Sequence, residues 1–156
     1  MIPYGRQEIC RDDIRSVIRT LNSDWLTQGP NVQKFEDLVA EQVGSNFAIA
    51  CNSATSALHL ACKSLNVKKG DIVWTSPNSF VASANAAIYC DAKVDFVDID
   101  PRTYNLSIEK LEQKLIYSKK NNCLPKIIIP VHFAGQSCDM KSIYKLSKKY
   151  KFKIIE

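Results

Sequence analysis

The sequence predicts an α/β fold with a mainly parallel sheet. Short apolar segments alternate with segments of helical periodicity along most of the chain, which is typical of strand–helix–strand units. The run formed by Ile127, Ile128, Ile129 and Val131 is apolar without alternation, as expected for a strand that is covered on both faces. We therefore expect parallel strands joined by right-handed helical crossovers.

The N-terminal third of the chain predicts two helices and one strand. A polar helix is expected over residues 7–22, followed by a loop at 26–30. A second helix over 32–43 ends at Gly44, because glycine tolerates the left-handed backbone that closes a helix. Residues 47–51 are small and apolar and predict a buried strand.

The remaining residues continue the alternation, with breaks at Lys69-Gly70, Pro77-Asn78 and Asp100-Pro101. Helices are expected over residues 56–65, 80–89, 108–118 and 140–150, and strands over 71–75, 94–99, 126–132 and 152–156. In a parallel sheet, ligands bind at the carboxyl ends of the strands. The turns at 52–56, 76–80 and 132–135 all follow predicted strands, so we expect them at that edge.

The turn at 52–56 is the most informative of the three. It consists of small residues, and it joins the strand expected at 47–51 to a helix, so it directs free backbone N–H groups and the positive end of a helix dipole to one point. This geometry suits a phosphate. The alternative is structural, since Ser53 or Thr55 would also serve as an ordinary helix N-cap.

Two further residues at the expected edge have alternative interpretations. Phe80 is either a core residue at the start of a helix or an aromatic ring that stacks on a planar ligand. His132 is either a hydrogen-bonded structural histidine or a residue of the pocket.

Composition and charge are those of a globular domain, with 46% apolar and 24% charged residues. No apolar run approaches the ~20 residues of a membrane span, and the N-terminus has no signal-peptide pattern. The net charge of +5 comes from dispersed lysines without a reading motif. We therefore expect neither a membrane nor a nucleic acid as partner.

The cysteines predict a reduced, cytoplasmic protein. None of the six forms a Cys-x-x-Cys pair, and two isolated histidines do not complete a zinc site with them. Cys51, Cys62 and Cys90 lie among apolar neighbours and are expected to pack as small hydrophobic residues.

Several segments, in order along the chain, carry a family pattern. They are PYG at 3–5, WLTQGP at 25–30, NSATSALHL at 52–60, PNSFVASAN at 77–85, VDID at 97–100 and PVHFAGQ at 130–136. With them the chain resembles, over essentially every position, the sugar-nucleotide aminotransferases of fold type I, which use pyridoxal phosphate. It is most similar to the transaminases that aminate a UDP-linked 4-keto-6-deoxy-N-acetyl sugar on the way to pseudaminic acid.

The resemblance implies a role for individual residues. Ser53, Ala54 and Thr55 match the loop that binds the cofactor phosphate, and Phe80 matches the aromatic residue that stacks on the pyridine ring. His132 matches a position at the edge of the pocket. The positions that match substrate-contacting segments are Tyr4, Asp24, Trp25, Leu26 and Thr27.

The resemblance also implies a three-layer αβα domain whose sheet has the strand order 3-2-4-5-6-7-1. The 156 residues would supply strands one to five of it, leaving the sheet incomplete. In the family, the strand ending at Glu156 is followed by the catalytic aspartate, later by the Schiff-base lysine, and then by a C-terminal domain. We therefore expect residues 1–156 to be the N-terminal part of the cofactor-binding large domain, with no catalytic residue and no activity by themselves.

Three functions stay open at this point. The first is part of an aminotransferase that moves an amino group, normally from glutamate, to a keto sugar nucleotide, working as a homodimer. The second is a related sugar dehydratase, in which a histidine replaces the lysine. The third is a non-catalytic remnant that binds a phosphate, a nucleotide or a partner subunit. The residues that distinguish the first two lie after Glu156 in the family pattern.

Overall fold

The computed structural model describes residues 5–156, so the expectation for Tyr4 lies outside the described residues. The chain divides into two compact units, Met1–Ala50 and Cys51–Glu156.

The first unit contains two helices, α1 (Arg11–Leu21) and α2 (Pro30–Val43). Helix α1 begins later than residue 7 because the Asp13 carboxylate accepts the N–H of Cys10 at 2.7 Å, which closes the first turn there. Helix α2 begins earlier than expected, since Pro30 occupies its first turn without needing an N–H donor. Gly44 closes α2 in the left-handed conformation, as predicted.

The strand expected at residues 47–51 is wrong. These residues adopt no regular structure, and Phe47 and Ile49 are 83% and 82% exposed. The segment bonds to side chains instead of to a neighbouring strand: Ala50 N donates to Glu36 Oε1 at 2.7 Å, and Phe47 N to Ser45 Oγ at 3.3 Å. A strand exists only through a paired ladder, and no other strand within residues 5–156 pairs with this segment. The expectation that Cys51 is packed in a core is wrong for the same reason, because Cys51 is exposed.

The second unit contains a four-stranded, all-parallel sheet. Its strands are β1 (Ile72–Thr75), β2 (Lys93–Phe96), β3 (Ile127–Ile129) and β4 (Lys153–Ile154), in the order β2-β1-β3-β4. This order is the 3-2-4-5 portion of the arrangement that the resemblance implies. The strands are shorter than the apolar runs that predicted them, because the ends of those runs continue into the loops at the sheet edges.

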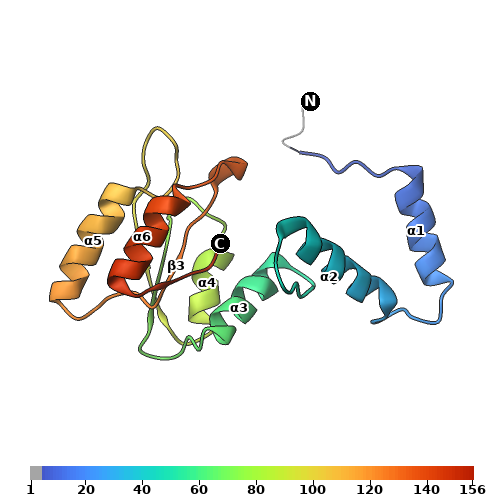
Figure 1. Cartoon of the computed structure of the whole chain (residues 1–156), viewed down its shortest axis with the longest axis horizontal. Helices are drawn as coiled ribbons and strands as arrows, with labels where there is room; N and C mark the ends of the chain where they lie inside the picture. Colours follow the sequence, from blue (N-terminus) through green and yellow to red (C-terminus); the bar gives the residue numbers. More distant parts are fainter. Residues whose placement is uncertain (1–4) are drawn as a thin grey trace. The chain divides into compact units, whose positions relative to one another are not determined.

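Four helices cover the two faces of this sheet (Figure 1). They are α3 (Ala54–Ser64), α4 (Ala82–Ile88), α5 (Ile108–Lys120) and α6 (Met140–Tyr150). Alternate residues of β1 and β3 enter two separate cores. Trp74 and Ile128 pack with α5 and α6, whereas Val73 and Ile127 pack with α3 and α4. The result is the expected three-layer αβα arrangement.

No helix of residues 5–156 has the length and apolar content that crossing a bilayer requires.

Candidate functional site

The turn before α3 is built around Ser53. This residue is extended (φ −163°, ψ 156°), and its hydroxyl oxygen accepts the N–H of Ser56 at 3.2 Å. Ser53 is therefore the N-cap of α3, as the structural interpretation of the turn requires. Asn52 holds the same turn, because its Oδ1 accepts the Ser56 hydroxyl at 2.7 Å.

Hydrogen-bond donors of this turn remain unpaired after capping. Within residues 5–156, no acceptor pairs with the backbone N–H groups of Ala54 and Thr55 or with the Thr55 hydroxyl. These three donors start the helix whose dipole is positive at this end. The turn can thus serve at once as a helix cap and as an anion site.

Charge distinguishes this helix start from the two other side-chain-capped starts in Cys51–Glu156. Helix α5 carries Glu109 in its first turn, and helix α6 is capped by the carboxylate of Asp139. The cap and the first turn of α3 contain no acidic side chain. An approaching anion therefore meets a carboxylate at the starts of α5 and α6 and none at the start of α3.

The start of α3 lies at the carboxyl edge of the sheet. A short connection, residues 65–71, joins the end of α3 to the amino end of β1, so the helix runs back along the sheet, opposite in direction to the strands. Eleven helical residues rise about 16 Å, enough to span the strands from one edge to the other. Buried Cys62 fixes this orientation by packing with Val73 of β1 and Ala86 of α4.

Phe80 lies at the same edge, between β1 and α4. Its side chain is 76% exposed, and the helix begins only at Ala82. A core role at the start of the helix is therefore wrong for Phe80. Burying an aromatic ring of this size is favourable, so an exposed Phe80 at the carboxyl edge of the sheet is available to a flat ligand.

His132 follows β3 at this edge and is hydrogen-bonded. Its Nδ1 accepts the N–H of Cys138 at 3.1 Å, and its Nε2 lies 3.5 Å from Glu156 Oε1. The Cys138 thiol donates to the carbonyl of Val131, and burial raises the pKa of this thiol. Asn105, which the sequence pattern did not single out, bonds to the same loop through both ends of its amide.

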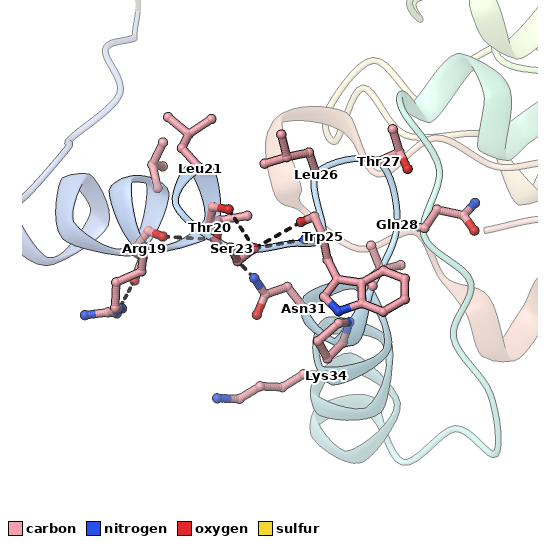
Figure 2. A pocket seen from close by; sticks show the side chains of 15 residues that line it. Arg19, Thr20, Leu21, Ser23, Trp25, Leu26, Thr27, Gln28, Asn31 and Lys34 are labelled. Atoms are coloured by element: carbon pink, nitrogen blue, oxygen red, sulfur yellow. Dashed lines mark hydrogen bonds between the residues drawn. The ribbon is translucent and has the colours of Figure 1, made fainter.

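The residues expected to contact substrate belong to the first unit. Trp25, Leu26 and Thr27 line a pocket between α1 and α2, and Asp24 does not (Figure 2). Ser23 shapes the loop by donating to the Thr20 carbonyl at 2.8 Å and accepting the Trp25 N–H at 3.3 Å.

A glycine lets Trp25 fold back over this loop. A Cβ at Gly29 would lie 2.7 Å from the Cβ of Trp25, and the φ of Gly29 is +157°. Both Trp25 and Leu26 are more than half exposed, so the mouth of the pocket is apolar. A pocket of this kind suits the flat or apolar part of a ligand.

The site residues are thus distributed over the two units. Ser53, Ala54, Thr55 and Phe80 lie in the second unit, with the first three forming one turn. Trp25, Leu26 and Thr27 line one pocket of the first unit.

The chain matches a known protein family over most of its length. Residues 7–156 match the model of the DegT/DnrJ/EryC1/StrS aminotransferase family. A UDP-4-amino-4,6-dideoxy-N-acetyl-beta-L-altrosamine transaminase of Campylobacter jejuni is 41% identical over 156 residues, which are 100% of this chain and 40% of that protein.

Solved structures give the same result. The Helicobacter pylori aminotransferase PseC, described as involved in the biosynthesis of pseudoaminic acid, superposes with a TM-score of 0.87 at 32% identity, covering 97% of this chain and 40% of that one. The pyridoxal phosphate form of a putative sugar aminotransferase of Streptococcus pneumoniae superposes with a TM-score of 0.86 at 30% identity, covering 97% and 38%.

The chain therefore spans about two fifths of the length of the relatives that it matches. The match to the family model extends through both units, from the pocket loop of the first to the strands of the second. The chain belongs to the DegT/DnrJ/EryC1/StrS aminotransferase family.

Proposed function

We propose that this chain supplies the phosphate-binding and ring-stacking part of an aminotransferase that uses pyridoxal phosphate and acts on a nucleotide-linked sugar. The observation that carries the proposal is the turn at Ser53, with its unpaired donors at the one capped helix start in Cys51–Glu156 that is free of acidic side chains. Residues 1–156 would form the N-terminal part of the cofactor-binding large domain.

The residues of the turn fit the phosphate of the cofactor. Backbone N–H groups of Ala54 and Thr55, with the Thr55 hydroxyl, offer three donors to its oxygens. Ser53 keeps the turn in place, since its hydroxyl oxygen accepts the N–H of Ser56 and lies 3.1 Å from the Ser56 hydroxyl. The role proposed for this turn is to bind and orient.

Phe80 fits the ring of the cofactor. Its exposed face at the carboxyl edge would stack on the pyridine ring and exclude water from one side of it. Pyridoxal phosphate, when bound, supplies the electron-withdrawing ring that stabilises negative charge beside the amino group being transferred. Phe80 and the Ser53 turn would together fix the direction of that ring, and no covalent step is assigned to them.

The substrate side of the proposal rests on the loop 24–27. We propose that Asp24, Trp25, Leu26 and Thr27, together with Tyr4, contact the sugar nucleotide. The apolar mouth at Trp25 and Leu26 suits the methyl-bearing face of a 6-deoxy sugar, and the Thr27 hydroxyl offers a polar contact. A UDP-linked 4-keto-6-deoxy sugar is the proposed acceptor, with glutamate as the amino donor.

Assembly and compartment complete the proposal. The complete enzyme would be a homodimer, which would cover apolar side chains of α1 and α2 such as Ile14, Val17 and Phe35, all more than half exposed here. We also propose that it works in the cytoplasm, where thiols stay reduced; all six cysteines of this chain are free.

Nuclear magnetic resonance of the 156-residue chain tests the proposal. The probe is pyridoxamine phosphate, which carries the phosphate and the ring but has no aldehyde to react with surface lysines. We expect saturable shifts of the Ala54 and Thr55 amides with pyridoxamine phosphate and with inorganic phosphate, and shifts of the Phe80 ring with pyridoxamine phosphate only.

The start of α5 is the matched control, since Ser107 caps it in the same way and Glu109 follows. Equal shifts at Ser107 and at Ser53, or shifts spread over the lysines, would contradict a specific phosphate site.

A further inference from the structure

One hydrogen bond and one close polar contact of His132 determine which of its ring nitrogens carries the proton. Nδ1 accepts the backbone N–H of Cys138 at 3.1 Å, so Nδ1 must be unprotonated. Nε2 faces Glu156 Oε1 at 3.5 Å, and a carboxylate can only accept. One form satisfies both contacts: the neutral imidazole with its proton on Nε2.

The bond to Nδ1 depends on the loop between His132 and Cys138. Residues 133–137 are exposed and lie outside the sheet. Two consecutive residues of the loop have a left-handed backbone: Ala134 with φ 52° and Gly135 with φ 81°. This conformation is unfavourable for alanine, although glycine adopts it readily. An exposed loop with this backbone needs an anchor if it is to keep the Cys138 N–H on the imidazole.

Asn105 is that anchor, and it is 5% exposed. Its Nδ2 donates to the carbonyls of Gln136 at 3.0 Å and Ser137 at 3.1 Å. Its Oδ1 accepts the N–H of Phe133 at 2.9 Å. Two carbonyls on one side and an N–H on the other fix the orientation of the amide. All three bonds fall between His132 and Cys138.

We propose that Asn105 is a positioning residue. By holding the 133–137 loop, it keeps the Cys138 N–H on His132 Nδ1 and thereby fixes His132 as an Nε2–H donor that faces the carboxylate of Glu156, two residues after β4. The hydrogen bonds stand independently, but their relevance to catalysis rests on the proposed function, which places the cofactor at this edge. A neutral His132 with its proton fixed on Nε2 would orient the Glu156 carboxylate without adding a positive charge at this edge.

The test reads the tautomer directly in the ¹⁵N-labelled 156-residue chain, at a pH of about 8.5, well above the ~6.5 at which an ordinary imidazole titrates. Long-range proton–nitrogen spectra distinguish a protonated ring nitrogen from an unprotonated one. We expect His132 to show a protonated Nε2 and an unprotonated Nδ1, with a coupling through the hydrogen bond between Nδ1 and the Cys138 amide nitrogen. A protonated Nδ1, or rapid averaging of both forms, would overturn the proposal without any variant.

Variants then test the role of Asn105. In Asn105→Asp, the acceptor for Phe133 N remains, but both donors are lost and an oxygen faces the two carbonyls. Asn105→Ala removes all three bonds. We expect both variants to lose the coupling and to show mixed tautomers at His132. If either variant folds and retains the single tautomer and the coupling, Asn105 does not position His132.

Controls separate this outcome from general damage. His59 is the other histidine of the chain, and its spectrum should be unchanged in every variant. Asn121→Ala removes an amide donor to the Tyr117 carbonyl at the end of α5, outside this loop, and should leave His132 unchanged. Asn105→Asp should also retain the pyridoxamine phosphate shifts at Ala54 and Thr55. Absence of those shifts in the unsubstituted chain would contradict the proposed function. The positioning role of Asn105 is decided separately, by the tautomer of His132 and its coupling to the Cys138 amide.

Discussion

The hydroxyl oxygen of Ser53 accepts the backbone N–H of Ser56 at 3.2 Å, so the residue proposed to face a phosphate is also the cap of its helix. Two substitutions separate these roles. Ser53→Ala should lower the free energy of unfolding by about 1 kcal/mol through loss of the cap.

Ser53→Asp should retain the cap, because aspartate caps as well as serine, while its charge repels a phosphate by about 1 kcal/mol per unit charge at 4 Å even in water. Urea unfolding and a pyridoxamine phosphate titration measure the two effects. The control Ser107→Asp changes the matching cap of α5 and should leave the titration unaltered. Undiminished affinity in Ser53→Asp would place the phosphate elsewhere.

The Thr55 hydroxyl should contribute to binding and not to folding. It has no hydrogen-bond partner within residues 5–156, so Thr55→Val should leave the free energy of unfolding nearly unchanged. Loss of a hydrogen bond to a charged phosphate should weaken pyridoxamine phosphate binding by ~1.5–3 kcal/mol. Pyridoxamine without its phosphate is the control ligand, and its affinity should be the same for both proteins. Unaltered phosphate affinity in Thr55→Val would contradict the assignment of this turn.

Phe80 should contribute to binding of the cofactor ring and not to binding of the cofactor phosphate. Phe80→Ala is expected to weaken pyridoxamine phosphate binding by about 0.5–1.5 kcal/mol beyond the lost area, with inorganic phosphate binding unchanged. Because the side chain is exposed, thermal stability without ligand should change little. Tyr117→Ala removes another exposed aromatic, on α5, and should alter neither affinity. A fall in melting temperature that is equal with and without ligand would instead indicate a structural Phe80.

Sequence periodicity predicted the helices well because their signals are local. Helix α6 has the predicted ends, Met140 and Tyr150, since Asp139 caps its start and its apolar residues recur at helical spacing. The order of the four strands agrees with the family resemblance. These features depend on neighbours in sequence or on a known topology.

The failures concern contacts between distant residues. An apolar run such as 47–51 does not reveal whether a partner strand exists, and within residues 5–156 it has none. Asn105 was missed for a similar reason: its bonding partners lie 28 to 32 residues further along the chain, in a loop without a periodic pattern. Phe80 could be given two roles from sequence, and its exposure excluded one of them.

The ion pair between Asp71 and Lys126 should make stability depend on acid pH. Lys126 Nζ lies 2.8 Å from Asp71 Oδ2, joining the segments that enter β1 and β3. Burial alone would raise the pKa of Asp71, but the hydrogen bonds from Lys126 and from the Lys68 N–H, with the charge of Lys126, outweigh it and hold this pKa below its ordinary value.

A carboxylate whose pKa is lowered by folding stabilises the fold above its unfolded pKa of about 3.9, and this contribution is lost as the pH falls through the lower folded pKa. We therefore expect Asp71→Asn to be less stable than the unsubstituted chain by about 1 kcal/mol at pH 7, with the difference shrinking below pH ~4. Urea unfolding at several pH values measures it. In a Lys126→Met background, Asp71→Asn should cost much less, and a difference that is constant with pH would contradict the ion-pair argument.

The cysteines should react in two groups that follow their burial. Burial and the neighbouring Cys90 thiol raise the pKa of Cys62 to about 11, whereas Cys10 and Cys51 are exposed. Because the thiolate is the reactive form, a pKa near 11 leaves on the order of one thiolate per thousand at pH 8, and the core also blocks access. Maleimide labelling of the native chain, followed by mass spectrometry, should therefore modify Cys10 and Cys51 quickly and Cys62 only as fast as the core opens. In urea all six cysteines should react. Fast native labelling of Cys62 would mean that the core between α3 and β1 opens readily. This packing would then not fix the orientation of α3, and the position of the Ser53 turn depends on that orientation.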